Sequence, residues 1–432
     1  MNMKIKLDPR KIYLSLFLFL FIFMPPIIPK INILYLLDLI SFFLLFTEYK
    51  DDMLAVLRIK SIKRFNEAYW IFVLCTIIHM FYDFAFVNKL DLIDYMISLY
   101  KLIGVGILIQ IVVIYCVCYC NKNKLSIEDL IQCIICAGLI QATITIFTLL
   151  SPSLKLFLYR IFINNVYGSE VQFARWMYSE RFFGFARVLF DGFGYGTGII
   201  AGLVFLRLFE KHKIKDVFQF SVLLLVPAVN AITGVVIALF SGIIILVNFL
   251  SNKKIKILSI IYFVGVFAIG ILGMIMLKEK AAMSFRRLWA NILAILGDYK
   301  GTTSFSNLMR KSYWILPTKV TNVLFGTGHS VYQIKNYTHS DVGYINMIWL
   351  SGIIGSAWLY GSFIALALNV KKCSINTLQK NISIFCIFAF LLFEAKGIGI
   401  AINTGIPIIM LIYYAILFEN CCDKTDKKLL YI

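Results

Sequence analysis

Long apolar runs, separated by shorter polar segments, recur along nearly the whole chain. An apolar run of about 20 residues crosses the hydrocarbon core of a bilayer as an α-helix, and a helix satisfies its own backbone hydrogen bonds there. The pattern therefore predicts an all-α polytopic membrane protein, folded as one integral membrane domain over residues 1–432. We predict a bundle of about twelve transmembrane helices, at residues 12–29, 31–47, 69–87, 102–120, 130–150, 188–208, 217–229, 231–250, 256–277, 343–369, 382–394 and 399–418.

The number of spans is open at three places, because the runs at 217–229, 231–250 and 382–394 are short or closely joined. Ten or eleven spans are the alternatives. The first apolar run follows a basic start, as a signal peptide does, but no cleavage site of small residues follows it. A second apolar run begins almost at once, so we interpret the first run as an uncleaved span.

Composition agrees with the membrane prediction. The chain is 60% hydrophobic and 15% charged, whereas a soluble domain is about a quarter charged. Most of the chain is then inside the membrane, so the net charge of +19 does not predict a nucleic-acid partner. Its meaning depends on which loops carry the basic residues. The ten cysteines fall in apolar runs or short segments, so no disulfide framework is predicted. The run CVCYC at 116–120 is expected to carry small buried side chains.

Seven short basic segments predict the orientation of the chain. Short loops rich in Lys and Arg stay in the cytoplasm, and these segments hold 24 of the 42 basic residues. Both termini are then cytoplasmic. The segments are residues 1–11, 48–68, 121–129, 207–215, 252–256, 371–380 and 422–430.

Two longer segments then face outward, at residues 151–187 and 278–343, and they hold five and nine basic residues. In the larger loop, apolar residues recur at helical spacing near Arg286, and a second helix is predicted over 304–316. Arginine binds phosphate through a planar fork of donors, so a cluster of arginines suits a pyrophosphate or an acidic lipid headgroup. The alternative is a basic surface attracted in a general way to anionic lipids.

Three groups of residues could carry chemistry in or beside these loops. The first is Arg181 with Gly184, before a glycine-rich span whose glycines serve either a ligand or helix packing. The second is the glycine pair Gly326 and Gly328. The third is His339 with Asp341: either side chain could act as a base toward a hydroxyl group, or both are solvated residues before a helix.

Two further ionisable residues, Glu394 and Lys396, fall near the predicted outer turn between the last two spans. An ionisable residue at membrane depth usually faces a cavity or a partner. The sequence contains no metal-ligand motif and no nucleotide-binding loop, so we predict neither a metal nor a cofactor.

These motifs resemble those of the O-antigen polymerase and O-antigen ligase family. The chain is similar to that family in its predicted spans, its two unequal external loops and its cytoplasmic ends. Two regions carry the resemblance at the level of motifs. They are Arg181-x-x-Gly184 with Asp191, and the stretch from Arg310 and Trp314 through the glycine turn to Asp341 and the pair Gly352 and Gly355.

The resemblance implies a glycosyl transfer without a metal ion at the outer face of the bacterial inner membrane. The donor would be a glycan on undecaprenyl pyrophosphate, and the acceptor another lipid-linked repeat unit. Membrane lipids and a chain-length regulator protein are further candidate partners. The resemblance assigns pyrophosphate contacts to Arg181, Arg187, Arg310 and Arg286, acceptor activation to His339 or Asp341, and structural roles to Gly184, Gly326 and Gly328.

One departure favours a polymerase over a ligase. Ligases carry a histidine eleven residues before the first glycine of the last pair, and Asp341 occupies that place here. The alternatives are a ligase that moves glycan to lipid A-core, a capsule or exopolysaccharide polymerase, and a flippase or transporter of lipid-linked sugars. Transporters usually have short external loops and repeated halves. The chain shows no such repeat.

Overall fold

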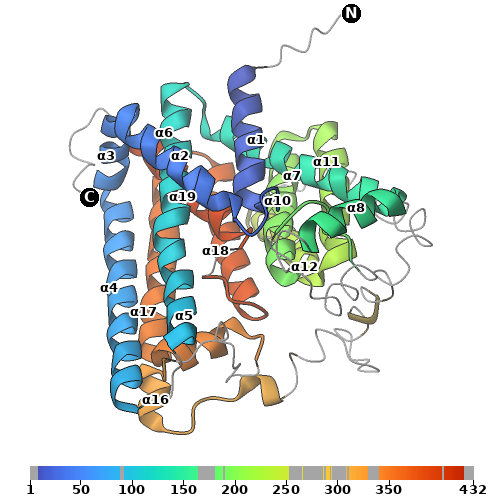
Figure 1. Cartoon of the computed structure of the whole chain (residues 1–432). Coiled ribbons are helices and arrows are strands. Elements are labelled where there is room, and N and C mark those ends of the chain that lie inside the picture. The colour runs from blue at the N-terminus through green and yellow to red at the C-terminus, as the bar shows by residue number, and fades with distance from the viewer. Residues whose placement is uncertain are drawn as a thin grey trace, which may run out of the picture.

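A computed structural model describes residues 8–87, 92–163, 181–187, 190–252, 311–328, 340–400 and 403–422, together with Gly265, Arg286, Trp289, Ala290, Asn291, Leu293 and Leu308. Over this part of the chain the structure contains 15 α-helices and no strand. The all-α prediction is therefore confirmed for the residues described (Figure 1).

The first third of the chain forms six helices, two of which run on into short π-helical turns. The turn Asp83–Val87 continues α4, and Val105–Ile109 joins α5 to α6. The helices are α1 (Pro9–Phe23), α2 (Ile33–Thr47), α3 (Lys50–Arg58), α4 (Lys60–Tyr82), α5 (Leu92–Gly104) and α6 (Gln110–Lys122).

Nine further α-helices follow, with a 3₁₀ turn, Lys311–Trp314, before α16. They are α7 (Ile127–Leu150), α8 (Pro152–Phe162), α10 (Phe190–Lys211), α11 (Ile214–Asn230), α12 (Ile232–Asn252), α16 (Val320–Phe325), α17 (Gly343–Cys373), α18 (Thr377–Glu394) and α19 (Ile406–Cys422).

Six of the described helical stretches are long and apolar enough to cross a membrane, and three shorter apolar helices accompany them. The chain is therefore a polytopic membrane protein. The predicted span at 256–277 lies outside the described residues, apart from Gly265. The six stretches are Lys60–Phe86, Leu99–Lys122, Ile127–Leu150, Gly192–Lys211, Gly343–Cys373 and Thr377–Glu394, and the shorter helices are Ile33–Thr47, Ile232–Val247 and Ile406–Cys421.

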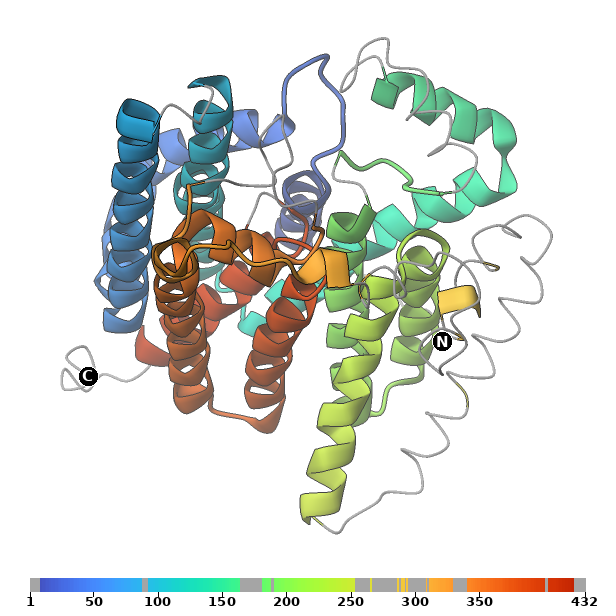
Figure 2. The same ribbon diagram turned by 90° about the horizontal axis from the view of Figure 1, so that it is seen from below.

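The helices pack as two groups with α18 and α19 between them. Figures 1 and 2 show α4 beside α17 in one group, and α10, α11 and α12 together in the other. A Cβ atom on Gly198 would overlap the backbone of Gly234, so α10 and α12 touch through their main chains. The glycines that begin α10 therefore serve close helix packing, one of the two roles left open by the sequence.

The first helix is shorter than the predicted span at 12–29. It begins after Asp8, whose carboxylate accepts a hydrogen bond from the backbone N–H of Arg10, and it ends at Phe23. Met24 has a left-handed backbone with φ of 47°, and two prolines follow at Pro25 and Pro26. Proline lacks the N–H that would continue a helix, which explains the earlier stop.

Several basic segments predicted to share one side of the membrane meet at one end of the helices. Lys11 pairs with Asp129 at 2.5 Å, Lys122 pairs with Glu48 at 3.1 Å, and Lys211 pairs with Glu128. We call the region of these three ion pairs the terminal end. The opposite ends of helices that start or finish there include Phe23 of α1, Leu150 of α7, Phe190 of α10 and Glu394 of α18.

Helix α17 covers the span predicted at 343–369, but it is broken near its start. Gly352 has a φ of 70° and a ψ of 179°, and the short part before it turns away from the longer part after it (Figure 2). The break leaves carbonyl groups without helical partners. The carbonyl of Trp349 accepts from the N–H and hydroxyl of Thr327 at 2.7 and 2.9 Å, and that of Leu350 from Gly328 N at 3.2 Å.

Nine of the ten cysteines lie among the described residues, and all nine are free thiols. The three cysteines of the run at 116–120 are buried, which confirms the prediction for that run, and Cys133 and Cys386 are buried as well.

Candidate functional site

A short extended segment crosses the ends of several helices and carries two of the predicted arginines. We call residues 181–187 the strap. The side chain of Asn230, at the end of α11, accepts from Phe182 N at 2.8 Å and donates to Phe182 O at 2.7 Å. Gln141 of α7 donates to Phe183 O at 2.5 Å, and Phe23 O accepts from Arg187 N at 3.0 Å. The strap is therefore tied to α1, α7 and α11.

Gly184 is the point at which the strap lies closest to α7. Its φ of +62° is in the left-handed region, which an L side chain rarely adopts. A Cβ atom there would lie 2.6 Å from Gln141 Nε2 and 2.8 Å from Thr145 Oγ1. Both the backbone conformation and the space therefore require glycine at this position.

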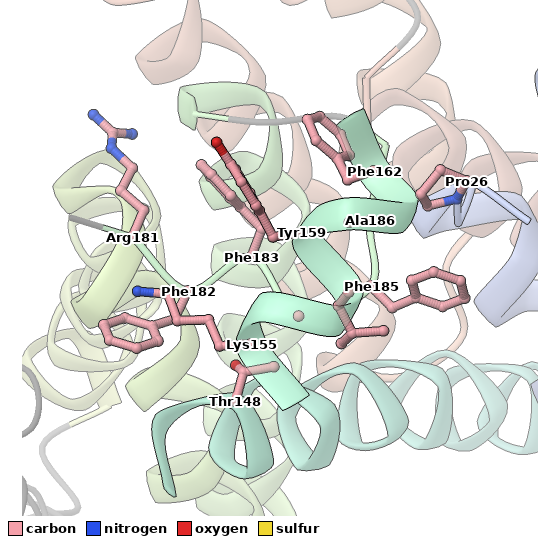
Figure 3. Close-up of a pocket in the computed structure, with 12 residues that line it drawn as sticks. Pro26, Thr148, Lys155, Tyr159, Phe162, Arg181, Phe182, Phe183, Phe185 and Ala186 are labelled. Atoms are coloured by element: carbon pink, nitrogen blue, oxygen red, sulfur yellow. The ribbon is translucent and has the colours of Figure 1, made fainter. Parts of the chain in front are cut away.

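The strap and α8 line a shallow hollow that is open to solvent; its empty space of about 490 Å³ includes part of that solvent. Two of its lining residues, Lys155 and Arg181, are basic and none is acidic. In Figure 3 the guanidinium of Arg181 and the hydroxyl of Tyr159 extend in the same direction, and Lys155 reaches over the ring of Phe182. The other lining residues are Pro26, Thr148, Leu158, Phe162, Phe183, Gly184, Phe185 and Ala186.

Helix α8 places two of its polar residues, Lys155 and Tyr159, on one face. Ser151 caps the helix by accepting from Leu154 N, and Pro152 occupies its first turn. Lys155 and Tyr159 are four residues apart, so they lie one turn above the other. The Lys155 ammonium lies 3.8 Å from the centre of the Phe182 ring, a cation–π contact. Burial lowers the pKa of Lys155 to about 8.

Two other predicted arginines, Arg187 and Arg286, are not among the residues that line this hollow. Arg187 donates to the carbonyl of Ile31 at 3.2 Å and so lies against the turn between α1 and α2. Arg286 is exposed in a helical turn. Arg310 and His339 lie outside the described residues.

Asp341 belongs to a second group of contacts, at the start of α17. Its Oδ2 atom accepts from Lys396 Nζ at 3.0 Å. The neighbouring Ser340 hydroxyl donates to Tyr313 O at 2.6 Å, which ties this start to the 3₁₀ turn at 311–314. Asn346 donates to the carbonyls of Ser340 and Val342 at 2.8 and 2.9 Å. Asp341 thus precedes the first turn of α17, and these hydrogen bonds hold the backbone around it in place.

The connection between α18 and α19 joins the two groups. We call residues 395–405 the α18–α19 loop, of which 401 and 402 lie outside the described residues. Thr404 donates to Gly192 O and accepts from Gly196 N at 3.0 Å, which fixes the loop on the start of α10, just after the strap. At its other side, Lys396 reaches Asp341. The described parts of this loop therefore contact both the start of α10 and the start of α17.

Gly326 and Gly328 lie beside the break in α17. Their φ values of +87° and +71° are left-handed, and a Cβ atom on Gly326 would lie 2.6 Å from Leu350 O. These glycines let the turn at 326–328 approach the α17 backbone and cap its free carbonyls. Gly326 and Gly328 therefore stabilise the break in α17, whereas Gly184 lets the strap pack against α7 beside the hollow.

Sequence reasoning did not single out several residues that build these groups. In the sequence, Lys155 is one of five basic residues of its loop, and its spacing from Tyr159 on a helical pattern is the signal that distinguishes it. Asn230 carried no signal, because only the fold brings it to Phe182. Lys396 was noted near an outer turn, but its partner could not be inferred from a separation of 55 residues.

The hollow combines positive charge with aromatic and aliphatic walls at the ends of apolar helices. Such a site suits an amphiphilic anion, whose charged group meets Arg181 and Lys155 while its apolar part meets the phenylalanines. The described residues contain no group of three or more His, Cys, Asp or Glu side chains that would hold a metal ion. No family model matches this chain, and no curated protein matches it.

Proposed function

We propose that this protein is a membrane glycosyltransferase that polymerises undecaprenyl-pyrophosphate-linked repeat units into O-antigen or a related surface polysaccharide. The observation that carries the proposal is the hollow between the strap and α8, where Arg181 and Lys155 stand among aromatic side chains. A lipid pyrophosphate is complementary to this lining, because it has a doubly negative headgroup and an apolar chain. The hollow takes the headgroup, and the membrane beside α8 takes the chain.

The reaction requires stabilisation of a leaving group. The acceptor hydroxyl attacks the anomeric carbon of the donor sugar and forms a new C–O bond, while the bond to the pyrophosphate breaks. The bonding electrons pass to a phosphate oxygen, and the lipid pyrophosphate departs with more negative charge than it had in the donor. Arg181 and Lys155 stabilise that charge by charge-assisted hydrogen bonds.

The acceptor hydroxyl must also lose a proton. Asp341 is the described carboxylate at the mouth of α17, and 58% of its side chain is exposed. We assign it the role of accepting the hydroxyl proton, which it then releases to water. His339, two residues earlier, is the second candidate for this proton transfer. Arg187 holds the strap through the carbonyl of Ile31, and so positions Arg181 rather than contacting the pyrophosphate.

The proposal places the terminal end in the cytoplasm of a bacterial inner membrane and the strap at the outer face. Basic short segments meet at the terminal end, in agreement with the orientation that such segments impose. The outer face is also where lipid-linked repeat units would be joined.

Deletion of the gene in its native host tests the proposal, with the surface polysaccharide separated on a gel. A polymerase deletion leaves core with a single repeat unit and removes the ladder. Loss of every repeat, with lipid-linked polymer accumulating, would instead identify a ligase. Loss of every repeat, with single lipid-linked repeat units trapped inside the cell, would identify a transporter. An unchanged ladder with loss of capsule would identify a different polymer.

Complementation then tests the site. We expect Arg181→Ala to reduce polymer formation about 100-fold, since removal of one group that stabilises transition-state charge costs a factor of about 10²–10³. Arg181→Lys should recover part of it. Arg64→Ala is the matched control, because Arg64 is exposed in α4 and belongs to no predicted site. Normal polymer with a stably inserted Arg181→Ala protein would contradict the role of the hollow.

A further inference from the structure

The ion pair at Asp341 is asymmetric. The Lys396 side chain is only 11% exposed, whereas its partner carboxylate is 58% exposed. The lysine thus lies behind the carboxylate and presents it outward. The pair engages Oδ2, so Oδ1 is the oxygen that can meet a group arriving from outside.

Lys396 owes its position to the start of the α18–α19 loop. The fully buried carboxylate of Glu394 accepts from Gly399 N at 2.8 Å and Ile400 N at 3.3 Å. The hydroxyl of Tyr360, in α17, donates to the other carboxylate oxygen at 3.1 Å. Lys396 N also donates to Phe393 O at 2.8 Å. Together these hydrogen bonds fix the shape of the turn.

The same turn holds the start of α17. A Cβ atom on Gly343 would overlap Glu394 Oε2 and the carbonyl of Gly397. The backbone two residues after Asp341 therefore packs directly on the loop that carries Lys396. The position of Asp341 is therefore fixed by two contacts: the packing of the backbone at Gly343 and the ion pair of its side chain with Lys396.

We propose that Lys396 is a positioning residue, which holds the Asp341 carboxylate in the orientation that receives the proton of the acceptor hydroxyl. This inference rests on the proposed function, and it adds a residue that acts through Asp341. Lys396 itself touches neither sugar nor pyrophosphate. Because half of the pair is exposed, the pair adds little to folding stability, and a variant without it should remain folded.

Turnover kinetics of the purified protein, with a lipid-pyrophosphate-linked repeat unit, test the role. We expect Lys396→Met to lower kcat about 10- to 100-fold while KM for the acceptor changes less than about threefold, because misplacement of a reacting group by about 1 Å costs up to about 10² in rate. Lys396→Arg, which keeps the charge and the reach, should restore most of kcat.

Lys372→Met is the control, since Lys372 is exposed in the last turn of α17, far along the helix from Asp341. Wild-type kcat in Lys396→Met would overturn the inference. Full activity in Asp341→Asn would overturn it as well, because Lys396 would then have no catalytic partner to position.

A second measurement does not depend on polymerisation. Asp341→Cys, in a protein with the exposed Cys75 replaced by serine, is labelled with an anionic and a cationic methanethiosulfonate reagent. A lysine next to the thiol favours the anionic reagent, by about tenfold for single charges a few ångströms apart in a watery setting. Adding Lys396→Met should remove that preference, and Lys396→Arg should keep it.

The two experiments separate the two claims. Equal labelling ratios with and without Lys396 would overturn the pairing, whatever the protein catalyses. Absence of polymer formation by the wild-type protein, with the labelling preference intact, would overturn the proposed function and with it the catalytic purpose of the pair.

Discussion

Arg207 and Arg187 show how differently one residue type is used in two regions of the molecule. Arg207 is buried in α10 and donates to Asp216, Gln132 and Gln219, each at 2.6 Å. Arg187, at the end of the strap, donates to the backbone carbonyl of Ile31. Arg207 has its charge balanced by a carboxylate inside the protein. Arg187 meets a neutral group, so it adds positive charge to the strap region.

Lysines in the two regions also differ in the groups that they contact. Lys11, Lys122 and Lys211 pair with carboxylates at the terminal end. Lys155 lies instead over the ring of Phe182, in a hollow whose lining has no acidic residue. The comparison teaches that basic residues at the terminal end join segments of the chain. Under the proposed function, those around the strap would present positive charge to the lipid pyrophosphate.

The largest effect is expected for the buried pair of α10 and α11. Asp216 is fully buried and the Arg207 side chain is 9% exposed, so removal of one partner leaves an uncompensated charge. Asp216→Leu should cost about 3–5 kcal/mol of stability. Thermal unfolding of the protein in detergent measures it. The double variant Arg207→Met with Asp216→Leu should regain most of the loss, and equal losses in single and double variants would show that the charge is not the cause.

The strap should be the next most sensitive region. Gly184→Ala forces a side chain into a left-handed backbone and against Gln141, at a cost of about 1–3 kcal/mol. Gly361→Ala is the matched control: Gly361 is helical and a Cβ there meets no atom within 4 Å, so alanine should stabilise α17 by about 0.5–1 kcal/mol. Opposite shifts in melting temperature are expected, and similar shifts would remove the special role of Gly184.

The hollow should respond to pH in the range where Lys155 titrates. Lys155 lies in α8, outside the candidate membrane spans, and burial lowers its pKa to about 8. The lysine is charged below that pH and becomes neutral above it, so affinity for a pyrophosphate should fall several-fold between pH 7 and pH 9. Lys155→Arg should bind equally well at both, since arginine stays charged. Isothermal titration with inorganic pyrophosphate measures this, and an identical fall in Lys155→Arg would assign the effect elsewhere.

The smallest effect is expected for an exposed pair at the terminal end. Lys122 and Glu48 are 49% and 51% exposed, and solvent screens their attraction. Lys122→Ala should change stability by about 0–1 kcal/mol and leave polymer formation unchanged. A loss as large as that of Asp216→Leu would mean that exposed pairs hold this fold together, contrary to the comparison above.

Apolar periodicity alone predicted most of the helices of this protein. Runs such as 102–120 and 130–150 correspond to α6 with its π turn and to α7, because a membrane leaves a chain little choice but to form a helix. The stop of α1 after Phe23 could have been predicted from Pro25 and Pro26, whereas the break at Gly352 could not. That break depends on the turn at 326–328, which supplies hydrogen bonds from another part of the chain.

For the candidate site, too, some features follow from the sequence and others only from the tertiary structure. The sequence by itself determined which residues can carry charge toward a phosphate and that Arg181 is followed by a glycine turn. Only the tertiary structure decided that Arg181 shares a hollow with Lys155, that Arg187 holds a backbone carbonyl, and that Lys396 stands behind Asp341. The physical reason is distance along the chain: a residue's own type sets its charge, but its partner is chosen by helix packing between segments that periodicity cannot align.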